Sequence, residues 1–310
     1  MRGSSIRRPW FNSIFRVLAV NLLIIIISAC QPKSPIVTLA LLGDLMIGRG
    51  TNPAPDSLAY LLPALRSADL ALANLESPLA QVLPAAGSSY NLCALSDRAD
   101  LLTYWGLDIL SLANNHNLDC GPNGNAGTKS ILETAGIASM GPGMQPLFRD
   151  VNGQHIAFLS FDDVSSVLDV NAATQAIHTA HSSGALVVIS IHWGAEYQGG
   201  VSDRQKFLAE DFAQAGAALI WGHHPHVLQP AGWIKTSRGK TFVIYSLGNA
   251  FFDQGGLAVT RQSALVEVRL GGGGIESVRS IPFEIDIEDS RVIQPDANTA
   301  ANILKRLNLP

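Results

Sequence analysis

Nearly continuous runs of apolar residues recur along the chain, and each ends at or beside a polar residue. The runs cover residues 36–44, 68–76, 107–116, 185–193, 217–224 and 241–249. Runs of this length are typical of strands that are buried on both faces of a sheet. We therefore expect a sheet core in which polar side chains gather at the strand ends.

Helical patterns separate these apolar runs. The candidate helices are residues 57–67, 96–106 and 202–216. Each begins at a serine that can cap a helix, the last two end at a glycine, and Pro63 interrupts the first. Residues 263–285 predict two strands joined by a glycine turn, and residues 296–310 predict a terminal helix. The alternation predicts an α/β fold with a largely parallel sheet core.

The first thirty residues have a different character. A basic start is followed by a short apolar segment, residues 17–29, and then by Cys30 after small residues. The segment is short for a membrane helix and fits a signal peptide, and "ISAC" resembles a bacterial lipobox, whose cysteine is lipidated. We expect residues 1–30 to be a lipoprotein signal peptide and residues 31–35 a linker. The alternative is an uncleaved N-terminal anchor, and either places residues 36–310 outside the cytoplasm.

Composition narrows the range of partners. The chain has 310 residues, is 47% hydrophobic and 15% charged, and carries a net charge of -4. These values favour a well-filled core and argue against nucleic acid as a partner. Cys93 and Cys120 are an even pair, for which a disulfide in an oxidising compartment is one option that the sequence leaves open.

Five strand ends carry residues capable of chemistry. They are Asp44, Glu76, Asn115 with His116, His192, and the segment 222–226. In open α/β sheets, ligands bind beyond the carboxyl ends of the strands, so we expect these side chains to converge. Each taken alone has a structural alternative: a turn or helix cap for the aspartate, a surface site for the glutamate, a turn for the asparagine and a core position for the histidine.

The segment "GHHPH" holds three histidines within four residues. In an extended segment, His224 and His226 point the same way, Pro225 stiffens them, and His223 points the other way. Such a pair could hold two adjacent metals. The alternative is a set of surface or core histidines.

Six motifs in order carry a resemblance to a known family. The motifs are "GDLMIGRG", "ANLESPL", "LANNHNLDCG", "SIHWGAEYQ", "GHHPHVLQP" and "YSLGNAFFDQ". Over residues 36–285 the chain resembles the CapA/PgsA family of bacterial capsule-synthesis proteins, which is similar to the calcineurin-like metallophosphoesterases. The resemblance implies a four-layer α/β/β/α sandwich with two divalent metal ions, of Mn, Zn, Fe or Mg, at the strand ends.

The resemblance also implies a role for each polar strand end. Asp44 and His226 would bind the first metal, and Glu76 would bridge both. The ligands of the second metal would be Asn115, His192 and His224. His116 would protonate the leaving group or stabilise its charge, while the metals activate a water molecule for in-line attack on phosphorus.

One position departs from the wider superfamily, and three others are candidates for substrate contacts. A histidine usually stands two residues after the first aspartate, where this chain has Met46, a poor ligand for hard or borderline cations. We therefore expect weaker binding of the first metal. Arg49, Glu196 and Asn249 are candidates to contact substrate, although Arg49 has a structural salt bridge as its alternative.

The function that follows is that of an exported, membrane-tethered, metal-dependent hydrolase-like protein. The resemblance implies work on an anionic cell-surface polymer, with poly-γ-glutamate the first candidate, in capsule synthesis, export or release beside membrane capsule-synthesis proteins. The alternatives are a non-catalytic component that binds or assembles the polymer, and a general phosphoesterase.

Overall fold

The computed structural model describes residues 35–84, 90–254 and 256–309. Residues 36–310 form one compact unit. The predicted signal peptide with Cys30, and all but the last residue of the predicted linker, lie outside the described residues. No helix in the described ranges is long and apolar enough to cross a membrane.

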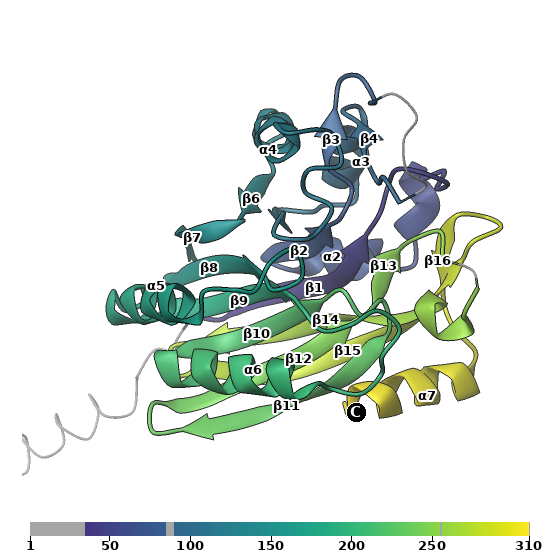
Figure 1. Cartoon of the computed structure of the whole chain (residues 1–310). Helices are drawn as coiled ribbons and strands as arrows, with labels where there is room; N and C mark the ends of the chain where they lie inside the picture. The colour runs from purple at the N-terminus through teal and green to yellow at the C-terminus, as the bar shows by residue number, and fades with distance from the viewer. Residues whose placement is uncertain (1–34, 85–89, 255, 310) are drawn as a thin grey trace, which may run out of the picture. The chain divides into compact units, whose positions relative to one another are not determined.

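Two mixed sheets form the centre of the unit (Figure 1). The first has the order β16 (Arg291–Ile293), β15 (Gly274–Asp286), β14 (Gln262–Gly271), β1 (Val37–Leu45), β2 (Leu70–Leu75), β5 (Ile109–Ser111) and β6 (Ala138–Met140), and β13 (Asn249–Phe251) also pairs with β1. The second has the order β11 (Leu228–Thr236), β12 (Gly239–Leu247), β10 (Ala217–His223), β9 (Leu186–His192), β8 (Gln154–Asp162) and β7 (Gly143–Val151). A separate two-stranded ladder joins β3 (Leu79–Ala80) to β4 (Ala94–Leu95).

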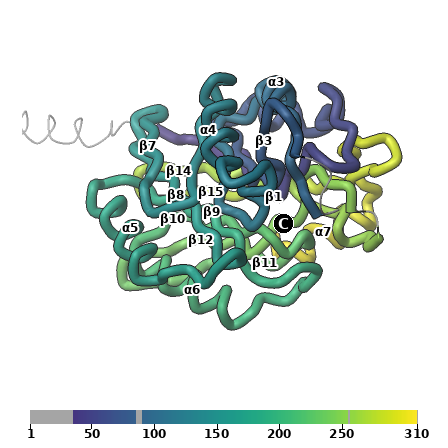
Figure 2. The backbone as a smooth tube through the Cα atoms, turned by 45° about the horizontal axis from the view of Figure 1, so that its top comes forward, coloured from purple at the N-terminus to yellow at the C-terminus, as the bar shows by residue number. Residues whose placement is uncertain are grey.

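Helices cover the outer face of each sheet (Figure 2). The first sheet is covered by α2 (Leu62–Ser67), α3 (Arg98–Tyr104) and α4 (Gly124–Thr134), and the second by α5 (Val170–Ser182) and α6 (Asp203–Ala215). The terminal helix α7 (Ala297–Leu307) inserts Ile303 and Leu307 into the core between the sheets. The predicted four-layer α/β/β/α sandwich is thus confirmed.

The side chains of β1 alternate between two packed layers, which explains why its sequence is almost continuously apolar. Leu39 and Leu41 belong to the core between the two sheets, whereas Ala40 and Leu42 belong to the core beneath the helices. Successive side chains of a strand point to opposite faces, so a strand with a packed layer on each side needs apolar residues at every position.

The parallel strands of each sheet are neighbours, in the middle of the second sheet and on one side of the first, where β6 is the edge strand. In the first, β1, β2, β5 and β6 run parallel, and in the second, β8, β9, β10 and β12 do. Antiparallel strands flank them, including the predicted hairpin of β14 and β15. The largely parallel core is therefore confirmed, but it is divided between two sheets.

Most predicted elements are present, with one correction, and several observed elements, β11 among them, carried no prediction. All six apolar runs contain strands, and α6 has a capping box at Ser202 and a left-handed Gly216 at its end. The single helix predicted over residues 57–67 is wrong: a 3-10 turn, η1 (Pro55–Leu58), precedes the short α2, which holds Pro63 in its first turn, where proline is tolerated. Residues 117–184 carried no prediction, yet they include β7, β8, α4 and α5.

A hydrogen bond joins the two sheets through the core. The indole nitrogen of the fully buried Trp221 donates to the carbonyl oxygen of Leu42 across 3.0 Å. The pairing of β1 with β2 shifts register between Leu41 and Asp44, so Leu42 lies outside that ladder. The indole therefore supplies a hydrogen bond to a buried carbonyl where the ladder is irregular.

We predict that Trp221→Phe lowers the free energy of unfolding by about 1–3 kcal/mol, because it leaves this carbonyl without its donor. Urea denaturation followed by circular dichroism measures the change. Trp233→Phe is the matched control, because Trp233 is 44% exposed and its replacement should change stability by less than about 0.5 kcal/mol. Equal effects of the two substitutions would contradict the assigned role.

Candidate metal centre

The carboxyl ends of the parallel strands of both sheets meet at one site. Asp44 is the penultimate residue of β1, Glu76 follows β2, His192 ends β9, and His224 and His226 follow β10. All five residues are at most 7% exposed. The structure thus brings together the side chains that the strand-end pattern predicts.

Asp44, Glu76 and His192 form the innermost group. Their ligand atoms all lie within 4.8 Å of one another, and Glu76 Oε1 is 3.6 Å from His192 Nε2. Within the described part of the chain, neither carboxylate oxygen of Glu76 has a hydrogen-bond partner. A buried carboxylate without partners is costly, and a cation would satisfy it. Carboxylate oxygen and imidazole nitrogen are ligands for several divalent metals, so these residues fit the metals that the resemblance implies.

A second group lies beside the first. Ligand atoms of Glu196, His224 and His226 also fall within 4.8 Å of one another, and the rings of His192 and His224 are 4.8 Å apart between centroids. Glu196 was a candidate to contact substrate, and the structure places it next to two predicted ligands.

Asn115 lies beside His192, its expected partner at the second metal, but His192 also lies in the group of Asp44 and Glu76. Asn115 Oδ1 is 2.8 Å from His192 Nε2, and His192 in turn groups with Asp44 and Glu76. His192 therefore contacts both groups, and the assignment of each ligand to one metal stays a prediction.

Two asparagines that the sequence analysis did not select lie against these ligands. The Asn74 amide donates to Asp44 Oδ1 at 2.8 Å and lies 3.3 Å from His192 Nδ1. The Asn114 amide donates to the Asn74 side chain and to the carbonyl of Leu75. Asn74 stands two residues before Glu76 and so shares its strand face, which was the signal that could have found it.

The pKa values of the two buried carboxylates are shifted in opposite directions. Burial and the negative charge of Asp44 raise the pKa of Glu76 well above its usual value. Burial alone would also raise the pKa of Asp44, but contacts with His223 and His226 outweigh it and hold that pKa well below its usual value.

The histidines also differ from one another. Burial and the proximity of His224 lower the pKa of His192 well below its usual value, and burial with the charge of His226 lowers the pKa of His224 to about 4. Burial alone would lower the pKa of His226, but Glu76 and Asp44 outweigh it and raise this pKa to about 9. The imidazoles of His192 and His224 are therefore neutral at neutral pH and can donate a lone pair to a metal. The two carboxylates instead favour the protonated form of His226.

The prediction of an extended segment at "GHHPH" is wrong. The strand ends at His223, and both His224 and His226 have left-handed backbones, with φ of 91° and 56°. Such conformations cost about 1–3 kcal/mol each in non-glycine residues and need fixed surroundings. Asp44 Oδ2 supplies one fixed contact by accepting the His224 backbone N–H at 3.1 Å.

His223 is also placed differently from its prediction. It does not point away from the site, because its Nδ1 is 3.4 Å from Asp44 Oδ1. Its ring packs edge-on against Trp221, with centroids 4.3 Å apart. Asp44 is thus contacted by the rings of His223 and His226 and by the backbone N–H of His224.

Asn249 reaches the site through the short strand β13. This strand leaves the second sheet and pairs with β1, where Asn249 is opposite Asp44. A side chain at Gly43 would place its Cβ 1.9 Å from the carbonyl oxygen of Gly248, so only glycine permits this approach. Asn249 Oδ1 lies 2.9 Å from His226 Nδ1, and the structure thus gives it a contact with a predicted ligand.

Arg49 and Met46 have structural partners nearby. Arg49 pairs through two nitrogens with Asp253, so the salt bridge that was its alternative is present. Met46 is fully buried in a small apolar cluster with Leu92 and Phe252, and the Phe252 ring is 4.9 Å from that of His226. The methionine therefore packs beside the site as an apolar residue.

Hydrogen bonds and a disulfide stabilise the loop that carries His116. His116 Nδ1 lies 2.9 Å from Asp119 Oδ2, and the same oxygen accepts the backbone N–H of Leu92 at 2.7 Å. Cys93 and Cys120 form a disulfide with Cα atoms 5.0 Å apart, which answers the question that the sequence left open. The disulfide and these hydrogen bonds together hold the histidine next to Asn115.

A family model described as "Bacterial capsule synthesis protein PGA_cap" matches residues 38–254. The chain belongs to this family. The matched range holds every candidate ligand from Asp44 to His226 and also Asn249.

Two relatives of this PGA_cap-family chain have names that refer to PGA or capsule biosynthesis. It is 30% identical over 300 residues to "PGA biosynthesis protein CapA" of Bacillus subtilis, covering 88% of this chain and 78% of the relative. It is 30% identical over 281 residues to "Capsule biosynthesis protein CapA" of Bacillus anthracis, covering 80% and 67%. A solved structure of a hypothetical protein from Thermus thermophilus aligns with a TM-score of 0.54 at 17% identity over 80% of this chain and 99% of that one, and supports the fold alone.

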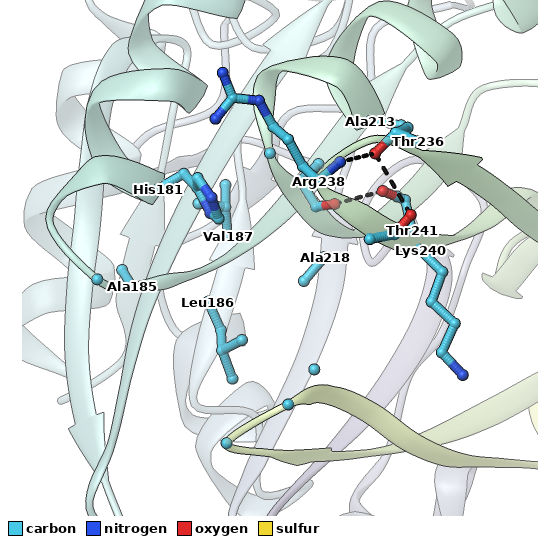
Figure 3. Close-up of a pocket in the computed structure, with 17 residues that line it drawn as sticks. His181, Ala185, Leu186, Val187, Ala213, Ala218, Thr236, Arg238, Lys240 and Thr241 are labelled. Atoms are coloured by element: carbon cyan, nitrogen blue, oxygen red, sulfur yellow. Dashed lines mark hydrogen bonds between the residues drawn. The ribbon is translucent and has the colours of Figure 1, made fainter.

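The PGA_cap-family chain also has a cavity of about 310 Å³ far from these ligands (Figure 3). It lies by the amino ends of β9, β10 and β12, and its lining includes His181, Arg238 and Lys240. None of the candidate ligands lines it. The groups suited to metal chemistry are therefore at the opposite ends of these strands.

Proposed function

We propose that this chain is a metal-dependent hydrolase in the synthesis, export or release of an anionic capsule polymer, with poly-γ-glutamate the first candidate. The family and the names of the two CapA relatives support the capsule role. The observation that carries the hydrolase role is the buried Glu76 carboxylate, which has no protein partner in the described ranges and faces Asp44 and His192.

The chain's own residues would hold up to two cations. Their ligands would come from Asp44, Glu76, Asn115, His192, His224 and His226. Divalent cations held there would supply Lewis acidity and lower the pKa of water in the site. Asn74 and Asn249 would keep Asp44, His192 and His226 in position through the contacts described above.

His116 would donate a proton to the leaving group. It adjoins Asn115 in the chain, its side chain is 17% exposed, and its Nδ1 faces Asp119. This contact orients the ring and leaves Nε2 to face the substrate, where it would donate a proton to the leaving group. Asp119 acts as a positioning residue, because the Leu92 N–H and the neighbouring disulfide fix it in turn.

One observation favours a second candidate function. Met46 packs in an apolar cluster where the superfamily usually has a metal-binding histidine. A centre with fewer ligands would bind one cation weakly, which suits a protein that binds or assembles the polymer without cleaving it. A general phosphoesterase is the third candidate, and it shares the metal centre.

The proposal includes tethering at the outer face of the membrane. The lipobox-like "ISAC" motif supports lipidation of Cys30, and the disulfide between Cys93 and Cys120 suits an oxidising compartment. Membrane capsule-synthesis proteins would then be partners at the same surface.

We predict that Cys30→Ala abolishes labelling of the chain by a radioactive fatty acid, because it removes the residue that would be lipidated. Metabolic labelling followed by immunoprecipitation measures this, and Cys93→Ser, which keeps Cys30, is the control. Absence of label on the wild-type chain would instead support the uncleaved anchor.

We predict that His116→Ala lowers turnover of poly-γ-glutamate or an aryl phosphate by about 10²–10⁴-fold while metal affinity stays the same, because the acid is lost and the ligands remain. Product release and Mn²⁺ binding are measured on the same preparations. His155→Ala is the control, since that histidine stacks on Phe148 at the amino end of β8, away from the carboxyl ends of the strands where the candidate ligands lie. Unchanged turnover would contradict the acid role, and no turnover by the wild-type chain would favour the assembly role.

A further inference from the structure

We infer that Glu196 is a metal ligand that shares one cation with His224 and His226. The inference rests on the proposed function, because it concerns the same centre. Glu196 is not among the ligands that the resemblance to the metallophosphoesterases implies.

The three side chains already have the spacing of a ligand set. One ligand atom from each lies within 4.8 Å of the other two, so small side-chain rotations would bring all three to coordination distance of one cation. His224 Nδ1 is buried and has no hydrogen-bond partner in the described part of the chain. The Glu196 carboxylate brings the negative charge that a cation needs beside the two imidazoles.

The backbone holds Glu196 at this place. The next residue, Tyr197, has a left-handed backbone with φ of 61°, and its N–H donates to the carbonyl of Pro225 at 2.8 Å. This bond ties the loop after β9 to the bend that carries His224 and His226. The strained conformations on both sides of the bond indicate a geometry maintained for function.

A series of side-chain hydrogen bonds also connects Tyr197 to His226. Gln254 donates to the Tyr197 hydroxyl at 3.1 Å and accepts from the Asn249 amide at 3.1 Å. Asn249 Oδ1 in turn lies 2.9 Å from His226 Nδ1. The loop of Glu196 and the ring of His226 are thereby positioned together.

Glu196 also compensates for Met46. The methionine side chain packs on Leu92 and Phe252 and offers no hard donor to a cation. A carboxylate oxygen from the opposite loop restores a third donor beside the histidines. Glu196 is exposed whereas His224 and His226 are buried, so it would bind its cation from the solvent side of the centre.

The test compares Mn²⁺ binding by the full-length chain in detergent with that of Glu196→Gln, which removes the charge and keeps the shape. Free Mn²⁺ is counted by electron paramagnetic resonance after chelator treatment and dialysis. We expect the substitution to weaken the more weakly held Mn²⁺ by at least about tenfold. Glu210→Gln, at an exposed position on α6, is the matched control and should bind like the wild type.

The outcomes separate this inference from the proposed function. Mn²⁺ binding by the wild type with no change in Glu196→Gln or Glu196→Ala overturns the role of Glu196 and leaves the metal centre standing. No Mn²⁺ binding by the wild type, with none for Zn²⁺, overturns both. Circular dichroism confirms that each variant is folded, which an exposed side chain should permit.

Discussion

The burial of two carboxylates where the two sheets meet is the constraint on which this structure depends. Asp44 and Glu76 are both fully buried, and charge at such a depth is unfavourable unless it is paired or coordinated. Asn74 and the His224 backbone N–H donate to Asp44, and the imidazoles of His223 and His226 lie beside it. Glu76 keeps both oxygens without a protein donor in the described ranges. A divalent cation would satisfy this arrangement.

The sandwich brings these groups together because the parallel strands of both sheets end on the same side. One sheet contributes the carboxylates and the other contributes the imidazoles of His192 and the bend after β10. The Trp221 hydrogen bond to Leu42 connects the two sheets two residues before Asp44, and β13 connects them again beside Asp44. The geometry of the centre is therefore a property of how the sheets pack.

Sequence patterns predicted the parts of this centre that are local. Continuous apolar runs are strands with a layer on each face, and a polar residue at the end of such a run lies at the sheet edge, so Asp44, Glu76 and His192 could be found. The division into two sheets depends on long-range pairing that no run encodes. The left-handed backbone at His224 depends on Asp44, 180 residues earlier in the chain, and Glu196 reaches the site through a bond to Pro225. Such contacts exist only after the sheets have packed.

The central claim is that the buried carboxylates and histidines hold metal. The most direct test is X-ray diffraction from crystals of the chain soaked in Mn²⁺ or Zn²⁺, with anomalous data collected on both sides of the metal absorption edge. The account predicts an anomalous peak within coordination distance of Asp44, Glu76 and His192, and a second beside His224, His226 and Glu196. Maps with no peak at these residues, from crystals with intact side-chain density there, would contradict it.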